Sequence, residues 1–145
     1  MIKRIISGGQ TGADQGGLIA GQQLEIPTGG WAPKNWMTED GPAPWLADFG
    51  LSECSTPGYA YRTHLNAHDA DATILLGDEH SPGSALTKRA CDRHFRPCSV
   101  NPSMNELRAL IRGEGWEVLN IAGNRESKNP GLFIVTVDLL MYALA

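Results

Sequence analysis

Strand-like apolar runs alternate with helix-like segments along the chain, and this alternation limits the fold more than any other feature. The clearest strand is Ala72-Thr-Ile-Leu-Leu76, and a helical pattern over 59–71 leads into it. Such alternation builds a parallel sheet covered by helices. We therefore predict an α/β fold: a Rossmann-like, doubly wound, mostly parallel sheet of about five strands with helices on both faces, in a single domain spanning residues 1–145.

The remaining elements are placed by short signals. Further strands are expected at 2–6, 26–31, 98–100 and 116–121, and further helices at 12–24 and 84–94. Capping patterns mark three helix starts, namely Thr11 with Asp14, Ser103 with Glu106, and Asn129 followed by Pro130. One face of the first helix is mostly small, which lets it lie close to the sheet: Ala13, Gly17, Ala20, Gly21 and Leu24. The stretch 33–57, rich in Pro, Gly and Trp, is predicted to be a long irregular loop that covers a site.

The composition excludes several classes of partner and site. A net charge of −4 and a pI near 5.5 argue against a nucleic-acid or anionic-membrane partner. Neither an apolar run long enough to span a membrane nor a signal peptide is recognisable, so we expect a cytoplasmic protein without a membrane partner. The three cysteines have no metal-ligand spacing and are expected to be free thiols, and the four histidines form no recognisable ligand set.

A glycine-rich stretch, Ser7-Gly-Gly-Gln-Thr-Gly-Ala-Asp14, follows the first predicted strand. Gly8, Gly9 and Gly12 allow either a tight turn or the close approach of an anion, to which Gln10 and Thr11 can donate hydrogen bonds. The spacing fits neither the dinucleotide fingerprint nor the Walker loop, so it supports neither NAD binding nor ATP hydrolysis. If the anion interpretation holds, Gly9→Val is expected to block the ligand and leave the fold intact.

Two other polar loops follow predicted strands. Gly83, Ser84 and Thr87 stand after the 72–76 strand, where Ser84 can cap a helix or bind an anion. The loop 122–130 after the last strand is rich in donors and includes Gly123, Arg125, Ser127 and Lys128. Ligands of such sheets bind beyond the carboxyl ends of the strands. Three such loops at one sheet edge therefore predict a site for a phosphate-sized anion.

Two further groups of residues leave alternatives open. Arg62, Asn66 and Asp69 share one helix face, which is either a solvated stripe with an internal Arg–Asp interaction or a polar wall with Arg62 facing an anion. Trp31 and Lys34 follow the second strand, where the indole either stacks on a planar ligand or packs in the protein.

Together these segments resemble the molybdenum cofactor carrier family, the circularly permuted branch of the lysine-decarboxylase-like (SLOG) superfamily. The resemblance covers nearly the whole chain, in order: 7–14, 29–34, 39–42, Tyr59 with Arg62 and Thr63, Asn66, 69–73, 83–87, 118–123 and 125–128. One departure is the Pro82-Gly-Ser84 turn, where a Gly-Gly-Thr type of turn is common in the family.

The resemblance implies a protein that binds and stores or protects the molybdenum cofactor, a phosphorylated pterin (molybdopterin) carrying molybdenum, in a Gly-rich pocket at the carboxyl edge of the sheet. We assign no catalytic residue and no metal ligand, and whether the molybdenum touches the protein is left open. The alternative is a nucleotide-binding or nucleotide-processing protein of the phosphoribohydrolase type. That activity uses a P-G-G-x-G-T-x-x-E pattern, whose final Glu is replaced here by Ala90, so a carrier is preferred to an enzyme.

The candidate cofactor-binding residues combine the three loops with the polar helix face and the segment after the second strand. They are Gly8, Gly9, Gln10, Thr11, Gly12, Trp31, Lys34, Arg62, Asn66, Gly83, Ser84, Thr87, Gly123, Arg125, Ser127 and Lys128. A flat pterin would be held by stacking and edge hydrogen bonds, with the 33–57 loop as a lid.

The closing helix predicts assembly. Its sequence from Leu132 onward is apolar nearly all round, with only Thr136 and Asp138 polar, whereas a surface helix of a monomer keeps a polar face. We expect a homo-oligomer, a dimer or tetramer, that forms through this helix. Molybdenum enzymes are the candidate recipients of the cofactor.

Overall fold

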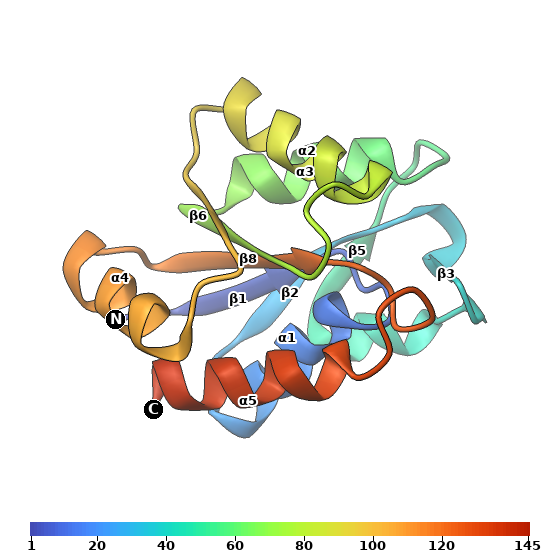
Figure 1. Cartoon of the computed structure of the whole chain (residues 1–145). Coiled ribbons are helices and arrows are strands. Elements are labelled where there is room, and N and C mark those ends of the chain that lie inside the picture. The colour runs from blue at the N-terminus through green and yellow to red at the C-terminus, as the bar shows by residue number, and fades with distance from the viewer.

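A six-stranded parallel sheet organises the computed structural model, which describes all of residues 1–145. The strand order is β5-β2-β1-β8-β6-β7, and every pairing is parallel (Figure 1). The strands are β1 (Arg4–Ser7), β2 (Thr28–Ala32), β5 (Leu51–Glu53), β6 (Ala72–Leu76), β7 (Cys98–Val100) and β8 (Val118–Gly123). The predicted fold class is confirmed, with one strand more than the five expected. β1, β2 and β8 each begin two residues later than predicted.

Helices cover both faces of the sheet. In Figure 1, α2 (Ala60–Asp69) and α3 (Pro82–Arg93) lie above it, and α1 (Ala13–Gln23) and α5 (Leu132–Leu144) lie below. α4 (Met104–Glu114) packs against α5, so three helices share the lower face. The main core lies between these helices and the sheet and includes Ile5, Leu119, Ile121 and Leu140. None of the helices has both the length and the apolar character needed to span a bilayer.

The segment 33–57 is more ordered than the predicted irregular loop. It contains two 3₁₀ helices, η1 (Lys34–Trp36) and η2 (Pro44–Phe49), an antiparallel hairpin of β3 (Met37–Thr38) and β4 (Gly41–Pro42), and the edge strand β5. A small core of its own holds it to the sheet: Leu18, Ala32, Ala43, Leu46 and Leu51. Each element is only two to six residues long, too short for periodicity in the sequence to reveal.

The predicted capping patterns have different outcomes. The pattern at α4 is confirmed, because Ser103 Oγ accepts the Glu106 N–H at 3.1 Å. The one at α1 is wrong, since no side chain caps this helix. Asp14 instead accepts the backbone N–H of Gln10, at 3.2 Å, and Thr11 turns its hydroxyl away toward another loop.

Two helices begin elsewhere than predicted. α3 begins at Pro82 with Ser81 as its cap, since Ser81 Oγ accepts the Ser84 N–H at 3.2 Å. α5 begins at Leu132 rather than Pro130. Its first N–H groups are satisfied by the carboxylate of Glu126, which accepts from Gly131 at 2.7 Å and from Phe133 at 2.9 Å. The amino end of α5 is therefore already occupied by an anion of the chain itself.

The small face of α1 packs directly on the sheet, as predicted. A Cβ at Gly17 would lie 2.8 Å from Cβ of Ile121, and one at Gly21 would lie 2.5 Å from Cγ2 of Thr28. These distances are shorter than van der Waals contact, so glycine sets how closely the helix approaches β8 and β2.

This packing predicts opposite effects for one substitution at two helical glycines. Gly113→Ala in α4 adds a methyl group to open space and should stabilise the protein by about 0.5–1 kcal/mol through helix propensity. Gly17→Ala gains the same propensity but must displace Ile121, and overpacking commonly costs about 1–3 kcal/mol. Chemical denaturation should therefore show a more stable Gly113→Ala and a less stable Gly17→Ala. A stabilised Gly17→Ala would contradict the close approach.

Candidate functional site

Three polar loops meet at the carboxyl edge of the sheet, as predicted. β8 lies between β1 and β6, so the loops after these strands are neighbours at the point where the strand order reverses. Hydrogen bonds join them: Asn124 Nδ2 donates to Ser81 Oγ at 3.1 Å, and the Glu126 N–H donates to Thr11 Oγ1 at 3.1 Å. Segments distant in sequence therefore form one surface at the switch point.

The glycines after β1 mainly accommodate protein groups. Positions 9 and 12 have positive φ values of 80° and 79°. A Cβ at Gly8 would lie 2.3 Å from Arg62 Nη1, one at Gly9 would lie 2.6 Å from Leu46 Cδ1, and one at Gly12 would meet the backbone of the loop after β8. The expectation that Gly9→Val would leave the fold intact is therefore wrong, because that position is both strained and filled.

The start of α3 is more open. A Cβ at Gly83 would meet nothing within 4 Å, whereas one at Gly123 would collide with the Leu76 carbonyl at 2.3 Å. Ser84 is buried, and its hydroxyl has no hydrogen-bond partner. Thr87 Oγ1 donates to the Gly83 carbonyl at 3.1 Å. Among the predicted residues, Gly83 and Ser84 thus offer an open backbone position beside an unused hydroxyl group.

A buried ion pair lies at the switch point. Asp14 Oδ2 is 3.7 Å from Arg62 Nη1, and the side chains are only 4% and 14% exposed. Burial raises the pKa of Asp14 to about 6, while the charge of Arg62 and N–H groups of Gln10 and Gly8 oppose the rise. The adjoining cavity has about 10 Å³, room for about one water. It is lined by Gly8, Asp14, Arg62, Thr63, Asn66, Thr87, Asn120 and Ala122.

The residues on the polar face of α2 contact two different parts of the protein. Arg62 faces Asp14 and lies over the Tyr59 ring, while its Nε has no partner. Asn66 instead exchanges two hydrogen bonds with the backbone of Trp31, at 2.9 and 3.0 Å, and Asp69 accepts the indole N–H at 3.0 Å. Of the two alternatives for this face, the solvated stripe with an internal Arg–Asp interaction is therefore wrong, because the acidic partner of Arg62 comes from α1 and Asp69 accepts the Trp31 indole N–H.

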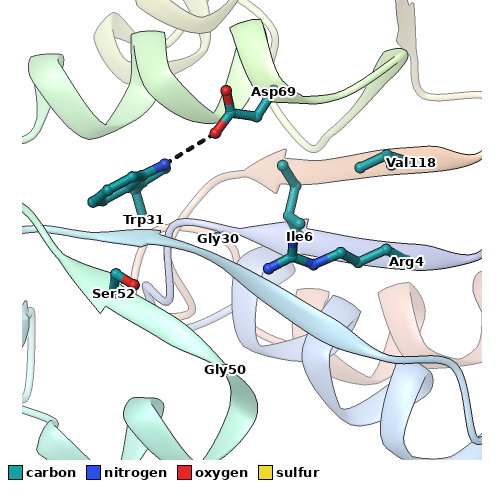
Figure 2. Close-up of a pocket in the computed structure, with 8 residues that line it drawn as sticks. All are labelled: Arg4, Ile6, Gly30, Trp31, Gly50, Ser52, Asp69 and Val118. Carbon is teal, nitrogen blue, oxygen red and sulfur yellow. Dashed lines mark hydrogen bonds between the residues drawn. The ribbon is translucent and has the colours of Figure 1, made fainter.

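A larger hollow of about 200 Å³ lies on the sheet face beside α2 (Figure 2). Its lining residues are Arg4, Ile6, Gly30, Trp31, Gly50, Ser52, Asp69 and Val118. Trp31 is the one predicted site residue among them, and Lys34 follows on η1, exposed and outside this lining. Arg4 and Val118 open their strands, so the hollow extends away from the three loops.

The loop after β8 carries three exposed predicted residues, Arg125, Ser127 and Lys128. Ser127 donates its hydroxyl and its N–H, the latter at 3.2 Å, to the carboxylate of Glu39, which also accepts the Thr11 hydroxyl. Burial works to raise the pKa of Glu39, but these hydrogen bonds and the charge of Arg125 outweigh it and hold that pKa below its usual value. Arg125 and Lys128 form no salt bridge.

Three carboxylates at this edge were missed as functional groups: Asp14, Glu39 and Glu126. In the sequence, Asp14 is part of a helix-capping pattern. Glu39 appears only as the first residue of the segment 39–42, one of those that resemble the family. The partners of Glu39 lie far away in sequence, 28 residues for Thr11 and 88 for Ser127, so no local spacing could have indicated them. Glu126 and Asp14 accept from nearer residues, but from backbone N–H groups, which leave no side-chain pattern in the sequence.

Other chemically reactive side chains lie outside this edge. The rings of His64 and His68 each stand edge-on to that of His94, a grouping that the sequence did not suggest. The structure contains no group of three or more His, Cys, Asp or Glu side chains arranged to bind a metal ion. All three cysteines are free thiols, as expected.

Comparison with known proteins gives two matches. The family model described as the circularly permutated YpsA SLOG family matches residues 5–144. Among solved structures, the crystal structure of the "Putative molybdenum carrier protein" from Syntrophus aciditrophicus SB is 37% identical in sequence, with a TM-score of 0.89. The alignment covers 99% of this chain and 96% of that one. No curated protein matches.

The buried pair yields a prediction about the Asp14 pKa. Arg62→Gln removes the cation that opposes the effect of burial, so this pKa should rise above its value of about 6 in a ¹³C NMR titration. Arg89→Gln, an exposed position on α3, is the control and should leave it unchanged. Because the folded pKa exceeds the unfolded value of about 3.9, the stability that Asp14 contributes is greatest below that value and is lost as the pH rises through about 6. An ordinary Asp14 pKa in the parent protein would refute this assignment.

Proposed function

Because the chain belongs to the circularly permuted YpsA SLOG family, we propose that it is a carrier that binds and stores or protects the molybdenum cofactor. The solved relative, 37% identical over nearly the whole chain, is named as a molybdenum carrier, which supports this role. The observation that carries the proposal is the meeting of three donor-rich loops at the switch point of the Rossmann-like sheet.

We propose that the phosphate of the ligand binds at this edge. Arg125 and Lys128 are exposed cations without a salt-bridge partner, and the Ser84 hydroxyl is buried without a hydrogen-bond partner. Gly83 leaves its backbone open to a ligand. Unpaired cations and donors of this kind favour a phosphate group.

The pterin ring requires more room than either hollow provides. Ligand pockets commonly measure about 300–1,000 Å³, whereas the hollow beside Trp31 has about 200 Å³. We propose that the segment 33–57 acts as a lid whose displacement enlarges the site. Trp31 stays anchored by Asn66 and Asp69 during this movement and offers its ring as a stacking surface.

A nucleotide-processing enzyme is the second candidate, because the donors proposed for the pterin phosphate could equally bind the phosphate of a nucleotide. Ala90 stands where a hydrolase of the superfamily would have its acidic residue, and it is fully buried against Ala67 and Cys91. No carboxylate is therefore available from that position of α3. This supports binding without hydrolysis.

We further propose that the protein is a cytoplasmic homo-oligomer that delivers its cofactor to molybdenum enzymes. α5 leaves Ile134 and Val135 exposed by 58% and 57%, with Tyr142 also exposed along the helix. Adjacent large apolar side chains on a helix surface favour a subunit contact.

The ligand prediction is tested by calorimetric titration with molybdopterin and with AMP. The parent protein should bind molybdopterin more tightly, and Arg125→Ala should weaken binding by about 1.5–3 kcal/mol if Arg125 makes a charged hydrogen bond to the phosphate. Arg112→Ala, in the last turn of α4 and so at the opposite edge of the sheet, is the matched control and should bind like the parent. The effect of Arg125 should shrink at high salt, because this side chain is exposed.

Two results would decide against the carrier. Failure of the parent protein to bind either ligand would exclude the proposed site. Release of base from AMP at a rate typical of a hydrolase would favour the enzyme.

The assembly prediction uses light scattering at micromolar concentration. The parent protein should be larger than a monomer, and Ile134→Arg should dissociate it by placing a charge in the apolar contact. Phe95→Arg changes an even more exposed apolar residue, 93% exposed and outside α5, and should leave the assembly intact. A monomeric parent would count against the α5 interface.

A further inference from the structure

The carboxylate of Glu39 is bound as an anion by two of the three loops. It accepts the Thr11 hydroxyl from the loop after β1, and the hydroxyl and N–H of Ser127 from the loop after β8. The positive charge of Arg125 also acts on it. Hydroxyl groups, a backbone N–H and a nearby guanidinium are donors that a tetrahedral oxyanion would use.

The bound carboxylate is also the main tether of the hairpin that carries it. All hydrogen bonds between the hairpin, residues 37–42, and the rest of the chain involve Glu39. Besides the carboxylate contacts there is one backbone contact, from the Glu39 N–H to Gln10 Oε1 at 2.9 Å. An anion that replaced the carboxylate would therefore release the hairpin tip from the loop after β8 and leave it held to the loop after β1 by the Glu39–Gln10 contact alone.

We propose that Thr11, Ser127 and Arg125 form a binding site for a tetrahedral oxyanion, and that the Glu39 carboxylate is its internal occupant, displaced when the ligand binds. The ligand chemistry is a dianionic tetrahedral group, supplied either by the phosphate monoester of a pterin or by molybdate itself. The inference rests on the proposed function for the identity of the ligand. Displacement would also begin the opening of the 33–57 lid, because the hairpin belongs to that segment.

The competing explanation is that Glu39 makes a fixed structural contact. The two explanations predict opposite changes in anion affinity when Glu39 is removed. If Glu39 only fastens the hairpin, its removal loosens the loops and weakens the binding of any anion there. If Glu39 competes with the ligand, its removal frees the donors and strengthens binding. Removing the Glu39 carboxylate removes its charge-assisted hydrogen bonds, which an incoming oxyanion would otherwise have to break. The expected gain in oxyanion affinity is roughly tenfold to a hundredfold.

The experiment titrates inorganic phosphate and molybdate into the parent protein and three variants, each checked for folding by thermal unfolding. Glu39→Ala should bind at least one of the oxyanions about tenfold more tightly or better, and Glu39→Gln should show a smaller gain because its amide still fills the site. Asp40→Ala is the matched control. It removes a carboxylate that lies on the same hairpin but makes no hydrogen bond, so this variant should bind the oxyanions about as tightly as the parent. If phosphate gains more affinity than molybdate, the bound group is the phosphate monoester of the pterin; if molybdate gains more, it is molybdate itself.

Amide exchange gives a second measurement on the parent protein. Saturation with the preferred oxyanion should leave the Glu39–Gln10 contact as the last hydrogen bond of the hairpin to the loops, so this contact should open more often and the Glu39 N–H should exchange faster with solvent. An unchanged exchange rate at saturation would mean that the hairpin stays in place when the anion binds, and would overturn the proposed displacement. So would a folded Glu39→Ala or Glu39→Gln that binds neither oxyanion more tightly than the parent.

Titration with molybdopterin separates this proposal from the carrier function. If Glu39→Ala gains oxyanion affinity and no variant binds molybdopterin, the oxyanion site stands and the carrier function fails. If the parent binds molybdopterin and neither Glu39 variant changes its affinity for molybdopterin or either oxyanion, the carrier function stands and the oxyanion site is overturned.

Discussion

The buried carboxylate of Asp14 holds the geometry on which the rest of the site depends. It accepts the Gln10 N–H inside the glycine-rich turn and faces Arg62, whose guanidinium fills the space above Gly8. Desolvation of the charge is costly, which raises its pKa, and the cation and the backbone N–H groups offset part of that cost. Groups of the chain itself thereby hold the turn, which presents the Thr11 side chain to the loop after β8 and to Glu39 of the hairpin.

Carboxylates of the chain occupy donors that the sequence assigned to a ligand. Glu126 satisfies the amino end of α5, and Glu39 takes the hydroxyl groups of Thr11 and Ser127. Unsatisfied donors at a sheet edge are costly, so internal anions that fill them stabilise this edge. The two carboxylates differ in how they are held to their partners: Glu126 lies five residues from Gly131, whereas Glu39 sits on a small hairpin far from Thr11 and Ser127 in sequence.

The fold could be predicted much further than the site. Alternation of apolar runs reports strands and helices locally, so β6 and β7 were predicted to the residue, and the small face of α1 was confirmed. The site depends on contacts between distant segments, which local patterns do not encode. Gly9 shows the limit: the sequence predicted a backbone open to an anion, but Leu46 from η2 fills that space.

The position of β8 explains why the site needs both ends of the chain. This strand follows all the others in sequence, yet it pairs with β1 and β6 in the middle of the sheet. The loop after it supplies Ser127 and Arg125, so the groups around Glu39 come together only once the last strand has been inserted between β1 and β6. Contacts between segments this distant close large loops of chain, which costs conformational entropy. Burial of β8 on both faces must offset that cost. The three loops and the centre of the sheet therefore depend on one another, and under the proposed function a ligand that binds the loops would also stabilise the insertion of β8.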